Sequence, residues 1–146
     1  MVCDISYALS MICPYCASDT KVTNSRPSHK FPEVWRRRQC KTCNNIWTTR
    51  EYLDLSTTHR VINRDSKIEA FQRDKLLLSI KDSLSHRKNS LTEASALTDT
   101  VLSRILTQKT AQISFKLICA QTYDVLMHFD KTAAAVYIAM HGENEE

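Results

Sequence analysis

The order of apolar and polar positions divides the chain into two regions. From residue 61 onward, apolar residues recur at helical spacing and predict helices at about 73–86, 91–107, 114–129 and 131–141. Just before them, residues 60–63 and 67–71 flank Arg64-Asp65-Ser66, a pattern that predicts a short β-hairpin. Ser90 and Glu93 fit a capping box for the second helix, and Asp130 fits an N-cap for the fourth. This region is therefore expected to be a hairpin followed by a small helical bundle.

Residues 12–52 lack helical periodicity. They contain all three prolines and have strand-prone pieces at 21–23 and 45–49, so short strands joined by turns are expected. The predicted fold class is α+β, with one small β domain at 11–52 and a second domain at 61–141. Residues 53–60 are expected to be a linker or a strand leading onward. Residues 1–10 are interpreted as an extension upstream of Met11, and residues 142–146 as a C-terminal tail.

Composition excludes several kinds of protein. The longest apolar run, Ala133 to Met140, has eight residues, too few to span a membrane. No secretory signal is expected, because Asp4 precedes any apolar stretch and no basic segment comes before it. The expected compartment is therefore the cytoplasm. Gly142 is the single glycine, whereas phosphate loops and dinucleotide-binding turns need several. Most kinases, NTPases and dinucleotide-dependent enzymes are thus excluded.

Charge is concentrated in the N-terminal region. Residues 1–60 carry nine Lys and Arg against five Asp and Glu, whereas residues 61–146 carry eleven of each. Residues 21–50 alone reach a net charge of +7. Such asymmetry predicts an anionic partner for the first region, although four thiolates around one Zn²⁺ would reduce the charge by two.

Two C-x-x-C pairs, Cys13/Cys16 and Cys40/Cys43, form the strongest pattern in the sequence. Each such turn can place two sulfurs on one metal, and four thiolates suit tetrahedral Zn²⁺. We therefore expect one structural zinc with no open position for a catalytic water. A redox motif or a coincidence is the alternative interpretation. Cys119 is expected to be buried in the third helix as a small apolar side chain, and Cys3 lies in the N-terminal extension.

Basic and hydroxyl residues flank the second cysteine pair. Trp35 and three arginines at 36–38 precede Cys40, and Trp47-Thr48-Thr49-Arg50 follows Cys43. An arginine cluster on a metal-fixed turn can contact phosphates or guanine edges of nucleic acid. The alternative is a solvated, charged face without a partner.

Lys75 and Arg64 suggest an anion site that needs no glycine loop. Lys75 falls in the first turn of the first predicted helix, where the helix dipole disfavours a cation, and Arg64 lies in the preceding hairpin. Both could bind phosphate at this helix N-terminus. A surface lysine without a role fits the periodicity equally well.

Together, these segments resemble the NrdR family of bacterial repressors of ribonucleotide reductase genes, over about residues 11–141. The motifs that carry the resemblance are Met11-Ile12-Cys13-Pro14-Tyr15-Cys16, Asn24-Ser25-Arg26, Arg36-Arg37-Arg38-Gln39-Cys40 and Trp47-Thr48-Thr49-Arg50-Glu51. The resemblance implies a zinc ribbon that binds double-stranded DNA. Its implied DNA-binding residues are Arg26, Arg36, Arg37, Arg38, Thr48, Thr49 and Arg50.

The second region resembles an ATP-cone, the nucleotide-sensing domain of ribonucleotide reductases. The cone pattern, V-x-K-R-D-G followed by Glu and Lys, maps without gaps onto residues 61–75, with Asn63 in place of its lysine and Ser66 in place of its glycine. The resemblance implies that Arg64 and Lys75 hold phosphates of ATP or dATP. The implied nucleotide-binding residues are Val61, Asn63, Arg64, Glu69, Gln72 and Lys75.

The expected function is that of a zinc-dependent repressor rather than an enzyme. The resemblance implies that adenine nucleotides in the cone change the state of a homo-oligomer and so position paired ribbons on operator DNA in the nucleoid, upstream of ribonucleotide reductase genes. One alternative is a ribbon that serves as an RNA or RNA-polymerase interaction module. Another is a detached allosteric subunit of the reductase. A nucleotide-hydrolysing enzyme is disfavoured because no general base accompanies Lys75 and Arg64.

Overall fold

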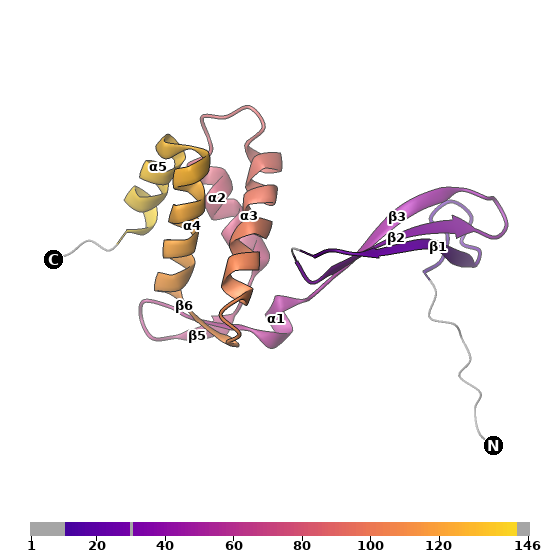
Figure 1. Ribbon diagram of the computed structural model, residues 1–146, viewed down its shortest axis with the longest axis horizontal. Coiled ribbons are helices and arrows are strands. Elements are labelled where there is room, and N and C mark those ends of the chain that lie inside the picture. Colours follow the sequence, from indigo (N-terminus) through magenta and orange to yellow (C-terminus); the bar gives the residue numbers. More distant parts are fainter. Residues whose placement is uncertain (1–10, 30, 143–146) are drawn as a thin grey trace, which may run out of the picture. The chain divides into compact units, whose positions relative to one another are not determined.

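The computed structural model describes residues 11–29 and 31–142, which form two compact units that divide between Leu53 and Asp54 (Figure 1). The proposed extension at 1–10 and residues 143–146 of the proposed tail lie outside the described residues. A unit of strands precedes a unit of helices with a small mixed sheet, which confirms the predicted α+β class. None of the helices in the described part is long and apolar enough to cross a membrane.

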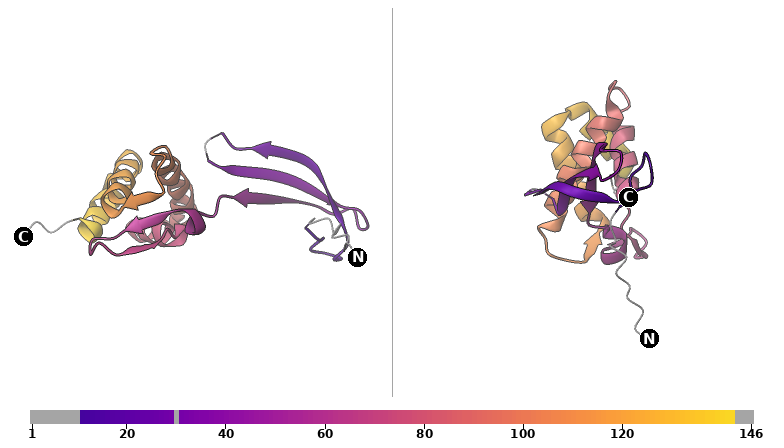
Figure 2. Two further views of the ribbon diagram at one scale, coloured as in Figure 1. Left: turned by 90° about the horizontal axis from the view of Figure 1, so that it is seen from below. Right: turned by 90° about the vertical axis from the view of Figure 1, so that its right-hand side faces the viewer.

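The N-terminal unit is one antiparallel sheet of β1 (Thr20–Pro27), β2 (Glu33–Cys40) and β3 (Ile46–Tyr52), with β2 in the middle. The left view in Figure 2 shows it as a single twisted layer. A β-bulge between Val22 and Asn24 shifts the register of β1, and the Thr23 hydroxyl there donates to the Arg37 carbonyl at 3.2 Å. The sheet has two faces and no packed core of its own, since seven of the eight residues of β1 are exposed.

The C-terminal unit places a small sheet at one end of a helical bundle (Figure 1). The sheet has the order β5-β4-β6, with β4 (Arg60–Ile62) antiparallel to β5 (Ile68–Ala70) and parallel to β6 (Gln112–Ser114). The helices are α2 (Arg73–Ser83), α3 (Ser90–Leu106), α4 (Phe115–Phe129) and α5 (Lys131–His141). The hairpin and the four helices match the predicted elements, whereas strand β6 was not predicted.

Apolar faces of the four helices form the core of this unit. The fully buried side chains include Ile80, Leu84, Val101, Leu102, Ile105 and Leu126. Thr98 and Thr122 are also fully buried, and each hydroxyl donates at 2.7 Å to the carbonyl four residues earlier. These bonds satisfy hydroxyls that would otherwise be costly to bury. Ala133 and Ala134 are fully buried on α5, where their small side chains let the helix pack closely against its neighbours.

The beginnings of the helices confirm one predicted cap and correct another. Asp130 caps α5, because its Oδ1 accepts from Thr132 N at 2.9 Å and from Ala133 N at 3.1 Å. The predicted capping box of α3 is wrong: the N-cap is Asn89, without a side-chain cap, and Ser90 is already helical. The Glu93 carboxylate is bound instead by Arg87, at 2.5 and 3.1 Å. An arginine fork offers the carboxylate two charge-assisted bonds, more than a backbone cap provides.

The segment between the two units also differs from expectation. Residues 53–60 were expected to be a linker or a strand, but they contain the one-turn helix α1 (Leu55–Thr58). The Asp54 carboxylate caps this helix by accepting from Ser56 N at 2.9 Å, and Leu55 is buried. From Asp54 onward, this segment belongs to the C-terminal unit, in which Leu55 is buried and the turn is capped.

Candidate metal centre, basic sheet and nucleotide pocket

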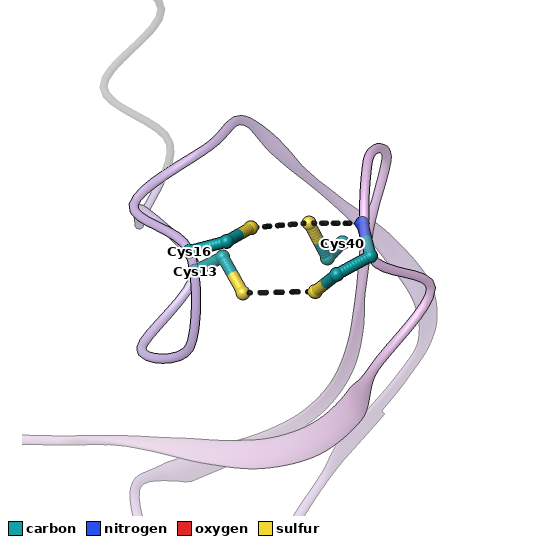
Figure 3. Close-up of side chains that lie close together, drawn as sticks. Cys13, Cys16 and Cys40 are labelled. Atoms are coloured by element: carbon teal, nitrogen blue, oxygen red, sulfur yellow. Dashed lines mark hydrogen bonds between the residues drawn. The ribbon is translucent and has the colours of Figure 1, made fainter.

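The four cysteines predicted as zinc ligands come together at one end of the β1–β3 sheet. Their sulfur atoms all lie within 4.8 Å of one another. Cys13 Sγ is 3.6 Å from Cys43 Sγ, and Cys16 Sγ is 3.5 Å from Cys40 Sγ (Figure 3). Zn–S bonds of about 2.3 Å in a tetrahedron put two sulfurs about 3.8 Å apart. The size and chemistry of this sulfur cluster therefore fit one Zn²⁺ with every position filled by protein.

Backbone amides surround the sulfurs as a thiolate site requires. Tyr15 N donates to Cys13 Sγ at 3.4 Å. Thr42 N and Cys43 N both donate to Cys40 Sγ at 3.3 Å. Such N–H donors favour the ionised form of a thiol, which is the form that binds a metal. The two C-x-x-C turns are thus preorganised to hold a cation.

The residue after each cysteine pair has a left-handed backbone conformation. Ala17 has φ 57° and Asn44 also has φ 57°. Asparagine tolerates this region well, whereas alanine has a steric penalty there, so the first turn is the more strained one. Hydrogen bonds from Ser18 lower the pKa of the Cys16 thiol to about 6. The hydrogen bond from Asn45 lowers the pKa of the Cys43 thiol, but burial and the neighbouring cysteines outweigh it and raise this pKa to about 11, so a metal would bind this cluster with release of protons.

The three consecutive arginines lie on strand β2, so their predicted position on a turn is wrong. Their register partners on β3 are Thr49 for Arg36, Thr48 for Arg37 and Trp47 for Arg38. Because side chains alternate along a strand, Arg36 and Arg38 lie on one face of the sheet and Arg37 lies on the other. The predicted DNA-binding residues are therefore divided between two surfaces.

We name these surfaces after their arginines. The Arg36 face carries Val22, Ser25, Val34, Arg36, Arg38, Trp47, Thr49 and Glu51. The Arg37 face carries Lys21, Asn24, Arg26, Glu33, Trp35, Arg37, Gln39, Ile46, Thr48, Arg50 and Tyr52. Of the residues predicted to bind DNA, Arg26, Thr48 and Arg50 share the Arg37 face, and Thr49 shares the other. The Trp47 ring meets the Tyr15 ring edge-on at 6.3 Å, beside the metal centre.

The C-terminal unit contains a cavity of about 190 Å³ where the small sheet meets the helices. Five of the six residues predicted to bind nucleotide line it, namely Val61, Asn63, Glu69, Gln72 and Lys75. Lys75 Nζ donates to Glu69 Oε2 at 3.0 Å. Lys75, followed by Asn63, lowers the pKa of the Glu69 carboxyl, so this acid is ionised at neutral pH. The cavity thus has a polar, hydrogen-bonding side at the start of α2.

Arg64 lies beside the cavity and does not line it. Its guanidinium donates to the His141 carbonyl at the end of α5, and its Cζ stands 4.7 Å from the centre of the Phe115 ring. Ser66, next to it in the hairpin turn, has φ 60°, the conformation for which the cone pattern uses glycine. The hairpin therefore keeps the turn geometry although the glycine is absent.

The remaining wall of the cavity was not predicted. It is formed by Ala70, Phe71, Leu76, Ser79, Phe115, Ile118, Tyr137 and His141. Ser79 Oγ and His141 Nε2 are hydrogen-bonded at 2.7 Å, and burial, followed by Arg64, lowers the pKa of His141. Helical periodicity marks Leu76 and Ile118 as core residues, but it cannot show that a cavity separates them. His141 lies far along the chain from the hairpin, so only tertiary packing brings it to the site.

Comparisons with known proteins agree with both halves of this arrangement. Residues 11–51 match the N-terminal domain of NrdR-like transcriptional repressors, and residues 59–146 match the ATP cone domain. The chain is 31% identical over 137 residues to the transcriptional repressor NrdR of Psychrobacter arcticus, covering 93% of this chain and 90% of that protein. It is also 31% identical over 140 residues to that of Pelobacter propionicus, covering 92% and 93%.

A shorter match reaches 51% identity over 71 residues with NrdR of Anaplasma marginale, covering 48% of this chain and 46% of that protein. A four-cysteine ribbon followed by an ATP cone defines a two-domain transcriptional regulator, and the relatives are named as repressors rather than enzymes. The chain belongs to the NrdR family of transcriptional repressors.

Proposed function

We propose that this protein is a zinc-dependent repressor that binds operator DNA of ribonucleotide reductase genes and responds to ATP or dATP. The observation that carries the proposal is the sulfur cluster at one end of a basic sheet, in a chain of the NrdR family. One structural Zn²⁺, held by Cys13, Cys16, Cys40 and Cys43, would fix the ribbon and supply folding energy, not chemistry. The protein acts in the cytoplasm, on the nucleoid.

The cavity of the second unit is the proposed effector site. Lys75 lies at the start of α2, where the Gln72 side chain does not cap the first N–H groups of the helix, and a cation beside these groups suits a phosphate. Arg64 would leave the His141 carbonyl and bind phosphate, a stronger acceptor for a guanidinium. Asn63 stands where the cone pattern has a lysine and cannot supply its charge. Lys75 and Arg64 would therefore be the cations that bind the phosphates. A cavity of about 190 Å³ is smaller than usual ligand pockets, so its walls have to open for a nucleotide.

Nucleotide and DNA binding are coupled through assembly in this proposal. A nucleotide shifts an equilibrium between oligomers only if it binds one of them more tightly than the other. ATP and dATP would therefore favour different homo-oligomers, of which one places pairs of ribbons at the spacing of the operator. Reciprocally, operator DNA would raise the affinity of the protein for the nucleotide that favours the DNA-binding oligomer.

Footprinting tests this function. The full-length zinc-loaded protein is incubated with DNA from upstream of the cell's own reductase genes, with ATP, with dATP and without nucleotide. We expect protection of a discrete segment that depends on the nucleotide, weakens steeply with salt and disappears with a zinc chelator. If the ribbon were an RNA or RNA-polymerase interaction module instead, no discrete segment of the DNA would be protected. A detached reductase subunit would instead co-purify with the reductase in the absence of DNA.

A further inference from the structure

The two faces of the β1–β3 sheet differ in how their arginines are engaged. On the Arg36 face, Arg36 holds Glu51 with two bonds, Nε to Oε1 at 2.8 Å and Nη2 to Oε2 at 3.1 Å. This pairing lowers the pKa of the Glu51 carboxyl. Arg38 Nε donates to Thr49 Oγ1 at 3.1 Å. Both guanidinium groups would have to give up partners within the sheet before binding another anion.

The Arg37 face offers more unengaged positive charge. It carries Lys21, Arg26, Arg37 and Arg50 against a single acid, Glu33. Arg50 lies 3.3 Å from Glu33, with over half of its side chain exposed. Within residues 11–29 and 31–142, no carboxylate lies within salt-bridge distance of Lys21, Arg26 or Arg37. Three cations of this face, Lys21, Arg26 and Arg37, can therefore bind an anion without breaking an ion pair, whereas Arg50 would first have to leave Glu33.

The bulge in β1 is what gathers these cations on one face. Strict alternation from Lys21 would place Arg26 on the opposite face, since the two are an odd number of residues apart. The extra residue between Val22 and Asn24 restores Arg26 to the face of Lys21, opposite Trp35 of β2. The Arg26 guanidinium accordingly lies 6.0 Å from the centre of the Trp35 ring.

The spacing of the three arginines across the Arg37 face suits a groove of DNA that has phosphates on both sides. Arg37 stands on the central strand β2, whereas Arg26 and Arg50 stand on the two edge strands, both opposite Trp35. Neighbouring strands are about 4.8 Å apart, so the edge arginines stand about 10 Å from each other across the sheet. The major groove of DNA is about 12 Å wide and admits two β-strands, so the central strand could enter it with one neighbour while the other edge strand lies against a phosphate-lined wall.

We infer that the Arg37 face is the surface that contacts DNA, with Arg37 reading base edges and Arg26 and Arg50 holding phosphates on either side. This inference rests on the proposed function and specifies its interface. A guanidinium on the central strand can bind guanine O6 and N7 with two bonds, which discriminates between sequences. Phosphate contacts from the edge strands position the sheet without reading sequence. The Arg36 face maintains the sheet and does not touch DNA.

Matched alanine variants of the full-length zinc-loaded protein test this assignment. The probes are a duplex from upstream of the reductase genes and a shuffled duplex of the same length. Arg37→Ala should lower affinity for the promoter duplex roughly five- to hundredfold and for the shuffled duplex much less. Arg26→Ala should weaken both similarly and reduce the salt slope by about one. Arg36→Ala, a neighbour of identical charge, should change either affinity less than about twofold.

Two results overturn the inference while leaving the proposed function intact: Arg36→Ala losing as much affinity as Arg37→Ala, or Arg37→Ala weakening both duplexes equally. Arg37→Lys provides a second probe, because it keeps the charge and loses the two-bond geometry. It should retain shuffled-duplex binding and lose promoter preference. Zinc content and far-ultraviolet circular dichroism verify that each variant is folded. A wild-type protein without preference for the promoter duplex overturns the proposed function, and the inference with it.

Discussion

The two units of this chain reach a fixed structure by different physical means. In the described part of the N-terminal unit, only Cys13, Thr20 and Cys40 are buried, and two of these belong to the sulfur cluster that could hold a metal. The C-terminal unit has an extended apolar core, to which α3 alone contributes five buried apolar residues. About 40 residues cannot bury enough apolar surface to fold alone without a cross-link or a metal. The sheet is therefore expected to depend on a bound cation, whereas the cone is held by its side-chain packing.

This difference also separates the two binding tasks. A sheet without a packed face leaves both surfaces free for long polar side chains, which is useful for contacting an extended polyanion. A packed bundle can instead enclose a small cavity and surround it with several elements. The cavity draws its walls from both β4 and β5 and from α2, α4 and α5. The helices that line the cavity also pack against one another. A ligand that binds in the cavity can therefore shift whole helices.

Removal of the metal ligands is expected to produce the largest contrast between the units. In Cys40→Ser and Cys43→Ser variants, zinc should be lost and the sheet should unfold, because structural zinc supplies about 10–16 kcal/mol in comparable small domains. DNA binding should disappear with it. Zinc content by atomic absorption and helicity by circular dichroism would be measured together, and the helical signal should persist.

Cys119→Ser is the matched control for these variants, because Cys119 lies on α4, outside the sulfur cluster. It should keep the full zinc content. Loss of the helical signal in the ligand variants would show that the cone also needs the metal, and the contrast drawn between the two units would then be wrong.

Sequence patterns predicted the cone far better than the sheet. Helices α2 to α5 bury one side, so their apolar residues repeat at helical spacing and reveal them. Strand β2, Glu33–Cys40, gives no such signal, because a sheet solvated on both faces has no reason to alternate apolar and polar residues. The arginines were therefore assigned to a turn. The C-x-x-C pairs still identified the sulfur cluster, since metal chemistry constrains residue type and spacing directly.

The candidate nucleotide site shows a similar limit. Its hairpin and α2 residues are close in sequence and follow a recognisable pattern, so five of them could be named in advance. The far wall includes Phe115 and His141, which reach the cavity through the packing of α4 and α5. Strand β6 was missed for the same reason: three residues, Gln112–Ser114, are a strand only because they pair with β4, about fifty residues earlier.

Asp130 offers a smaller and more local test within the cone. It caps α5, and its Oδ2 also accepts from His86 Nε2 at 2.9 Å and from Arg87 Nη1 at 3.1 Å. Asp130→Ala removes the cap and both contacts, so the free energy of unfolding of the cone should fall by about 1 to 3 kcal/mol. Urea unfolding followed by helical circular dichroism measures this loss. An Asp74→Ala control at an exposed site on α2 should change it by less than about 0.5 kcal/mol.

The same residue predicts a dependence on pH. His86, the Ala133 amide and Arg87 lower the pKa of Asp130 to about 2. The carboxyl of an unfolded chain has a pKa of about 3.9, so the folded cone binds fewer protons at this site than the unfolded chain between these values. The stabilisation by Asp130 is therefore complete above about pH 4 and declines as the pH falls towards 2. The stability difference between the wild type and Asp130→Ala should shrink over this interval; a constant difference would contradict the linkage.

The smallest expected effect concerns one cation in the cavity and leaves both folds intact. Lys75→Ala should weaken binding of ATP or dATP about tenfold, close to 1.4 kcal/mol, because one charge-assisted contact to phosphate is lost. Calorimetric titration measures the affinity. Lys81→Ala is the control: Lys81 lies on the same helix, pairs with Asp82 at 3.2 Å and does not line the cavity. Its variant should bind nucleotide as the wild type does, and zinc content should be unchanged in both. If both variants lost the same nucleotide affinity, Lys75 would act only through its positive charge. The cavity would then have no specific phosphate contact at the start of α2.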